Sequence, residues 1–210
     1  MSDYLRDPAE IYRRSFATIR AEVDLAHFPS ALEPIVVRLI HACGMTDIVD
    51  DLAFSPDVVE AGRAALAAAA PILCDGRMVA DGIVRARLPR ANEIVCGLDG
   101  DRLASDAARA GTTRAAAAVD GWRRHLGCAI VAIGTAPTAL FRLLELLDGG
   151  APRPAAILAF PVGFVGAAEA KEALAADSRG VPFLTLRGRR GGSALAAAAV
   201  NALAVGKEMP

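Results

Sequence analysis

Short apolar runs alternate with longer helical segments from about residue 70 to the end of the chain. This alternation is typical of a parallel sheet, because parallel strands are buried on both faces and need long crossover connections. Five runs are predicted to be strands: Ile72–Cys74, Glu93–Gly97, Cys128–Ile133, Ala155–Phe160 and Pro182–Leu186. The pattern predicts an α/β fold with a flavodoxin-like, doubly wound parallel sheet of about five strands in the order 2-1-3-4-5.

Helix-start signals occupy the N-terminal part of the chain. Asp7 followed by proline predicts the start of a first helix that runs to about Leu25. A capping box that begins at Ser30 predicts a second helix, and Gly44 predicts its end. No linker or repeat divides the sequence, so we expect one domain over residues 1–210, with the helical N-terminus as its extension.

Composition excludes several classes of partner. The net charge of −1 argues against nucleic acid and membrane surfaces, and no apolar stretch is long enough to span a bilayer. The opening residues lack the pattern of a signal peptide, so we expect a cytoplasmic protein. The four cysteines are widely spaced, which indicates neither a zinc site nor disulfides, and we expect buried, reduced thiols.

Arginine supplies all but two of the 23 basic residues. A guanidinium binds a carboxylate through two parallel hydrogen bonds, so this bias fits a pocket for carboxylates, although a GC-rich genome also explains it. Ligands of open α/β sheets bind outside the carboxyl ends of the strands. The loops expected there cover residues 75–77, 134–138, 161–166 and 187–193. The last loop combines glycines, three arginines and a helix start, which favours an anion, but tight turns with solvated arginines explain it equally well.

Motifs for other chemistries are absent from the sequence. There is no phosphate-binding G-x-x-x-x-G-K-[ST], no dinucleotide G-x-G-x-x-G after the first strand and no G-x-S-x-G. The histidines His27, His41 and His125 stand alone, so no metal site is expected. His41 is predicted in the last turn of the second helix, where the helix dipole would raise its pKa and allow it to donate a proton. A purely structural histidine is the alternative.

Five stretches together resemble the precorrin-8X methylmutase family, in order and over the chain from Tyr12 to Leu203. They are Arg38–Gly44, Thr112–Arg114, Gly134–Phe141, Phe160–Glu169 and Gly188–Ser193. The resemblance implies a flavodoxin-like homodimer without cofactor or metal that converts precorrin-8X to hydrogenobyrinic acid by moving a methyl group between adjacent ring carbons. The partners it implies are this tetrapyrrole substrate and its product.

The resemblance also implies roles for individual residues. His41 would protonate the macrocycle as the methyl group migrates, and Ser15 of the first helix would touch the substrate. Arg114 and the neighbouring Thr113, both in the Thr-Thr-Arg motif, would touch it as well. Ser15 is also the one polar residue on an apolar helix stripe, although a serine bonded to its own backbone is equally ordinary.

The substrate is a broad apolar disc with carboxylates around its rim, so further arginines are candidate rim contacts. These are Arg85, Arg87 and Arg187. Two positions depart from the family pattern. Val84 stands where related sequences often have threonine, and Thr135 where they often have asparagine.

Three alternatives remain open from the sequence. A cobalt-precorrin-8 methylmutase would use the same acid and loops, so sequence discriminates it poorly. A non-catalytic tetrapyrrole carrier would bind without turnover. An anion-binding regulatory domain would have no affinity for corrinoids.

Overall fold

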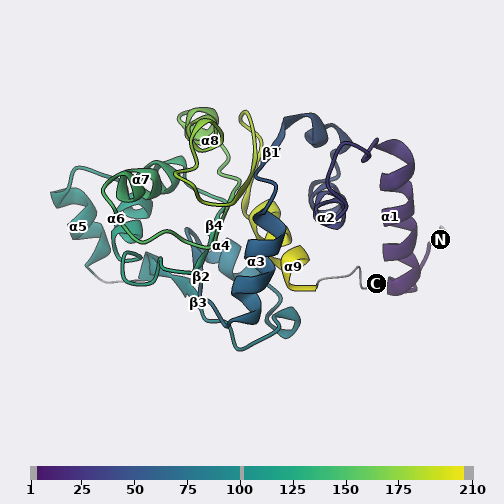
Figure 1. Ribbon diagram of the computed structural model, residues 1–210, viewed down its shortest axis with the longest axis horizontal. Coiled ribbons are helices and arrows are strands. Elements are labelled where there is room, and N and C mark those ends of the chain that lie inside the picture. Colours follow the sequence, from purple (N-terminus) through teal and green to yellow (C-terminus); the bar gives the residue numbers. More distant parts are fainter. Residues whose placement is uncertain (1–3, 100–101, 206–210) are drawn as a thin grey trace.

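A six-stranded sheet forms the centre of the computed structural model, which describes residues 4–99 and 102–205 (Figure 1). Its strands are β1 (Leu52–Phe54), β2 (Ile72–Cys74), β3 (Ile94–Cys96), β4 (Ile130–Ile133), β5 (Ala156–Ala159) and β6 (Phe183–Leu186). The order is β1-β6-β5-β4-β2-β3. The five predicted strands are all present and parallel, and their mutual order is the predicted 2-1-3-4-5.

The edge strand β1 was not predicted, so the expected number of strands was too low. It pairs antiparallel with β6, Leu52 opposite Leu186 and Phe54 opposite Leu184. Its three residues are only half-buried, so they lack the fully apolar run of a central strand. Through β1 the N-terminal part of the chain joins the same sheet.

Helices connect the strands and precede them. The α-helices are α1 (Pro8–Glu22), α2 (Glu33–Cys43), α3 (Val58–Ala67), α4 (Arg77–Gly82), α5 (Leu103–Arg109), α6 (Arg114–Asp120), α7 (Pro137–Asp148), α8 (Ala167–Ala176) and α9 (Ser193–Val205). Short 3₁₀ helices are η1 (Thr46–Asp51), η2 (Arg85–Arg87) and η3 (Gly97–Asp99). None of the helices within the described ranges is long and apolar enough to cross a membrane.

Two hydrophobic cores cover the two faces of the sheet. One joins α1, α2, α3 and α9 to alternate strand residues such as Ile72 and Leu158. The other joins α6, α7 and α8 to the strand residues that point to the opposite face, such as Leu73 and Ile157. Strand side chains point alternately to opposite faces, so each parallel strand must be apolar throughout.

The starts of the N-terminal helices agree only in part with the sequence signals. The Asp7 carboxylate caps α1 by accepting from the Ala9 N–H at 3.0 Å, as predicted, but the helix ends at Glu22. The second helix begins at Glu33 and not at Ser30. Glu33 bonds the Arg20 guanidinium of α1 at 3.0 Å, so it ties two helices together instead of completing a capping box. Gly44 ends α2 in the left-handed conformation, as predicted.

None of the four cysteines forms a disulfide, and their burial differs from the expectation. Cys74 is buried, and burial raises the pKa of its thiol well above the usual range. Cys128, in contrast, is exposed, because it lies in the turn before β4 and not inside the strand.

The loop after β6 packs directly on the end of β5. A methyl group at Gly191 would collide with the carbonyl oxygen of Phe160 and lie 2.8 Å from that of Pro161. Backbone cannot move aside cheaply, so Gly191→Ala should lower the free energy of unfolding by about 1–3 kcal/mol in a denaturant titration. Gly127→Ala is the control, since its methyl group would meet only Pro152 at 3.7 Å. Equal stability of the two variants would show that this loop is not packed as described.

Candidate active site

The Asp75 carboxylate joins two of the loops at the carboxyl edge of the sheet. It lies directly after β2, is 2% exposed, and accepts hydrogen bonds from the backbone N–H groups of Gly134 (2.8 Å), Thr135 (2.8 Å) and Ala136 (2.7 Å). The Thr135 hydroxyl donates to it as well, at 2.5 Å. Thr135, which departs from the family pattern, therefore holds its own loop in place.

Arg190 connects the last loop to the segment that follows α2. Its guanidinium bonds Asp47 and Asp51 of η1, each at 2.7 Å. Its carbonyl accepts from the Lys171 Nζ of α8 at 2.5 Å. Lys171 is fully buried, and burial lowers the pKa of its ammonium group to about 8. These contacts fix the end of α2 relative to the sheet.

His41 lies in the last turn of α2, as predicted, with its side chain exposed. One side of its ring packs against α1, where the rings of Tyr12 and Phe16 lie 5.3 Å away between centroids. Its open side borders a shallow hollow of about 370 Å³ that Ser15 also lines. The structure therefore brings His41 and Ser15 together. The other lining residues are Arg14, Thr18, Ile19, Glu22, Ile40, Gly44 and Thr46.

The predicted direction of the His41 pKa shift was wrong, because two other effects outweigh that of the helix dipole. Burial against α1 lowers the pKa of the imidazole below 6.5, and the positive charge of Arg38, one turn earlier, lowers it further. Arg38 is itself buried, with its guanidinium 5.5 Å from the Phe16 ring centroid. A nearby cation and loss of solvent both disfavour a second positive charge. Both effects favour the neutral imidazole.

Arg114 and Thr113 lie at the start of α6, away from His41. Thr113 caps α6 by accepting from the Ala116 N–H at 3.2 Å, and its hydroxyl bonds that of Thr138 at 2.8 Å. The exposed Arg114 guanidinium donates to the Leu98 carbonyl at 3.2 Å. Figure 1 shows α6 toward one end of the long axis, with α1 and α2 toward the other. Within one chain, Thr113 and Arg114 therefore lie apart from His41 and Ser15.

The predicted rim arginines are dispersed. Arg187 is exposed directly after β6 and pairs with Glu172 at 3.5 Å. Arg85 is exposed in η2, near enough to the end of β2 to oppose the effect of burial on the pKa of Cys74. Arg87, in the same turn, is half-buried. The neighbouring Val84 is 41% exposed.

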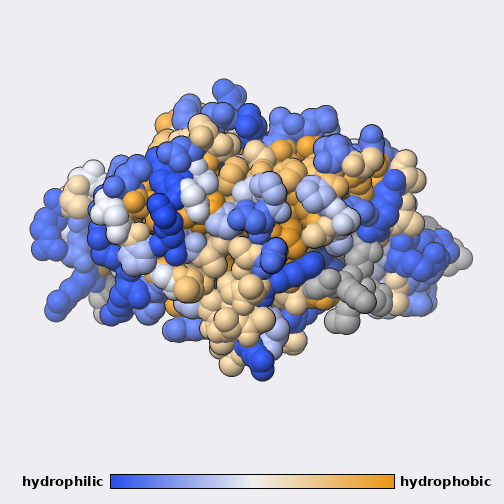
Figure 2. All heavy atoms as spheres, viewed as in Figure 1, coloured by the Kyte–Doolittle hydropathy of each residue, from blue (hydrophilic) through white to orange (hydrophobic). Residues whose placement is uncertain are grey.

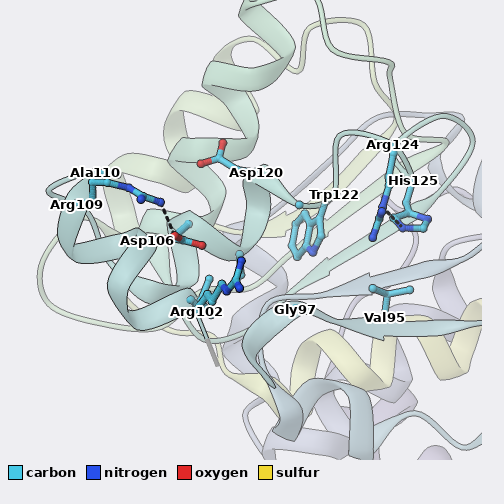
Figure 3. A pocket seen from close by; sticks show the side chains of 14 residues that line it. Val95, Gly97, Arg102, Asp106, Arg109, Ala110, Asp120, Trp122, Arg124 and His125 are labelled. Carbon is cyan, nitrogen blue, oxygen red and sulfur yellow. Dashed lines mark hydrogen bonds and ion pairs between the residues drawn. The ribbon is translucent and has the colours of Figure 1, made fainter. Parts of the chain in front are cut away.

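A larger hollow of about 560 Å³ lies between α5, α6 and the end of β3 (Figure 3). Neither His41 nor any predicted substrate contact lines it. Its rim charges are largely engaged, since Arg109 bonds Asp106 at 2.5 Å and the Arg124 Nε donates to His125 at 3.0 Å. Figure 3 shows the Trp122 ring between this Arg124–His125 pair and Arg102. This hollow is therefore a weaker candidate for the active site than the hollow at His41.

Sequence reasoning missed three residues that organise the site: Asp75, Arg38 and Arg190. Asp75 and Arg190 occupy loops that the strand pattern places at the ligand-binding edge. Their positions could therefore be predicted from the sequence, but their hydrogen-bond partners could not. Arg38 lies within the histidine motif. A signal for it was its place between apolar residues on a buried helix, where a cation must affect its neighbours.

Comparison with known proteins decides the family. The family model described as precorrin-8X methylmutase matches residues 10–205. The chain belongs to the precorrin-8X methylmutase family. A precorrin-8X methylmutase from Pseudomonas aeruginosa is 64% identical, over 99% of this chain and 100% of its own. One from Sinorhizobium is 57% identical, over 96% of both chains.

Solved structures agree with the precorrin-8X methylmutase assignment. The crystal structure of a precorrin-8X methylmutase from Thermus thermophilus matches with a TM-score of 0.83 and 40% identity, over 93% of this chain and 94% of that one. Two relatives named cobalt-precorrin-8 methylmutase also match, at 35% and 38% identity. The similarity thus extends over almost the whole length and includes the N-terminal helices that carry Ser15 and His41.

The electrostatics of His41 generate a direct test. In a titration of imidazole signals by NMR, the His41 midpoint should lie below 6.5, because burial and Arg38 both oppose protonation. Arg38→Met removes one of these causes and should raise the midpoint. Arg38→Lys keeps the positive charge and should leave it low. A midpoint above 6.5 in the unsubstituted protein would mean that the helix dipole dominates after all.

Proposed function

We propose that this chain catalyses the conversion of precorrin-8X to hydrogenobyrinic acid, with His41 as the general acid. Membership of the precorrin-8X methylmutase family makes it an isomerase of cobalamin biosynthesis. The observation that carries the assignment of the acid is the position of His41, open to a hollow that it shares with Ser15. The methyl group moves between adjacent carbons of one molecule, so no oxidant, reductant or methyl donor is required.

Because the pKa of His41 is lowered in the free protein, we propose that the bound substrate helps to protonate His41. A tetrapyrrole with several carboxylates brings negative charge beside the imidazole, and nearby negative charge favours the imidazolium form. Binding should therefore raise the pKa of His41 from its low value in the free protein. The protonated imidazole then gives its proton to the macrocycle, which becomes electron-poor, and this eases the methyl shift. A proton returns to His41 after the shift, because substrate and product are isomers.

Ser15 and the arginines are proposed to hold the substrate. The hollow that Ser15 shares with His41 supports this role for Ser15, and the exposed position of Arg114 at the start of α6 supports it for Arg114. Thr113 positions Arg114 through its cap of α6. Arg85 and Arg187 are exposed cations near the carboxyl ends of β2 and β6, where they could pair with carboxylates of the rim.

We further propose a flavodoxin-like homodimer in the cytoplasm. Apolar side chains lie across the middle of one face, between hydrophilic ends (Figure 2), which supports coverage by a second copy. A two-fold dimer could also place His41 of one protomer near Arg114 of its partner, although one chain keeps them apart. Four cysteines that form no disulfide agree with a reducing compartment.

The metal-free substrate is favoured over the cobalt-containing one by similarity alone, since relatives named for it are 64% and 57% identical and those named for the cobalt form are less so. Turnover rates with precorrin-8X and with cobalt-precorrin-8, followed by the visible spectrum, separate the two. A protein that bound hydrogenobyrinic acid but isomerised neither substrate would be a carrier.

His41→Asn tests the acid. Asparagine keeps a hydrogen-bond donor of similar size but cannot release a proton at neutral pH, so single-turnover rates should fall by about 10²- to 10⁴-fold. Affinity for hydrogenobyrinic acid should change little, because the proton transfer acts in the transition state. His125→Asn is the matched control, since His125 lines the other hollow, and it should retain full activity. A rate for His41→Asn within about twofold of the unsubstituted enzyme would place the acid elsewhere.

A mixing experiment tests whether the pocket spans two protomers. His41→Asn and Arg114→Ala should each have low activity alone. If His41 and Arg114 of one pocket come from different protomers, random exchange of the two variants should restore activity to about a quarter of the sites. No restoration, with exchange of protomers confirmed by mass spectrometry, would mean that each pocket takes both residues from one chain.

A further inference from the structure

We propose that Phe164, Val165 and Arg189 form a contact surface for the tetrapyrrole. The two apolar side chains lie against a face of the ring system, and the guanidinium lies beside a carboxylate of its rim. We call these three residues the lip. The inference rests on the proposed function, because it says where the substrate of that reaction is held.

The exposure of the lip is the first observation. Phe164 is 85% exposed and Val165 is 89% exposed, although both are large and apolar. They follow β5, a strand in the interior of the sheet, so they lie at the carboxyl edge where ligands of such sheets bind. Adjacent exposed apolar side chains with a polar rim mark an interaction site more often than an ordinary surface.

The backbone of the lip is held in place from both sides. The Gly163 N–H donates to the Arg189 carbonyl at 3.2 Å, and the Gly192 N–H donates to the Phe160 carbonyl at 2.7 Å. Gly166 ends the loop in the left-handed conformation, with φ of 79°. The loops after β5 and β6 are thus bonded to each other. A surface fixed in this way loses little conformational entropy when a rigid disc binds to it.

Charge identifies the occupant. The Arg189 guanidinium lies 5.5 Å from the centroid of the Phe164 ring, and it makes no ion pair within the part of the chain that the structure describes. A ligand that suits the lip therefore has an apolar face and a carboxylate at its edge, which is the chemistry of a corrin precursor. A contact between two copies centred on the lip would bring two Arg189 cations together, which like charges oppose.

The lip is continuous with the surroundings of His41. Arg190, the residue after Arg189, bonds Asp47 and Asp51 of η1. That helix begins at Thr46, which lines the hollow beside His41. The loop that carries Arg189 is therefore bonded, through Arg190, to the helix whose first residue lines the site of the proposed acid, which supports one ligand for both.

Titration of the full-length protein with hydrogenobyrinic acid, followed by absorbance, tests the lip. Phe164→Ala should weaken the affinity about ten- to a hundredfold, as loss of one buried aromatic side chain predicts. Phe164→Trp keeps a flat apolar surface and should restore most of it. Arg189→Gln should weaken binding and reduce its dependence on ionic strength. Tyr4→Ala is the matched control, because Tyr4 is 67% exposed with the Arg6 guanidinium 4.9 Å from its ring centroid, yet lies before α1.

Three results would overturn the inference. The first is equal affinity of Phe164→Ala and the unsubstituted protein. The second is an equal loss in Tyr4→Ala, which would indicate a nonspecific effect. The third is conversion of a dimer into monomers by Phe164→Ala in sedimentation equilibrium, which would make the lip a contact between copies. Absence of both turnover and binding in the unsubstituted protein would instead reject the proposed function.

Discussion

Helix α9 is buried on every side, and its small residues set how closely the other elements approach. Ala196, Ala197 and Ala199 are each at most 3% exposed. Glycines face the helix from two neighbouring segments. A methyl group at Gly82 would lie 2.7 Å from the Ala197 Cβ, and one at Gly134 would lie 2.8 Å from the Ser193 Cα. Such close packing has few alternatives. The position of α2, which packs on α9 and carries His41, follows from it.

Polar contacts hold the loops that surround this packed core. Asn201 of α9 accepts from the Val84 N–H at 2.8 Å and donates to the Gly82 carbonyl at 2.9 Å, so it fixes the turn after α4. Asp75 does the same for the loop after β4, and Arg190 for the loop after β6. These are buried or half-buried groups with several partners each, and loss of the central group would leave its partners unsatisfied. These contacts hold the loops at the carboxyl edge of the sheet in place.

The sequence predicted the elements whose signals are local and missed those that depend on distant partners. Five strands and their order followed from apolar runs, since a buried parallel strand is apolar throughout. The strand at Leu52–Phe54 carries no such signal, because only its pairing with β6 defines it. The position of His41 at a helix end was also local, whereas the direction of its pKa shift depends on contacts with α1 and on the buried Arg38. The separation of Arg114 from His41 is likewise a property of the fold alone.

The electrostatics suggest why a neutral resting histidine suits this reaction. An imidazolium in the free protein would lie close to the buried Arg38 cation, and the surroundings of α1 would offer it little solvation. The proposed substrate supplies the compensating charge itself, through carboxylates that also draw it to exposed arginines such as Arg189. Protonation of His41 is then linked to occupancy of the site, because each favours the other by the same free energy. The acid would be charged mainly when a macrocycle is present to receive its proton.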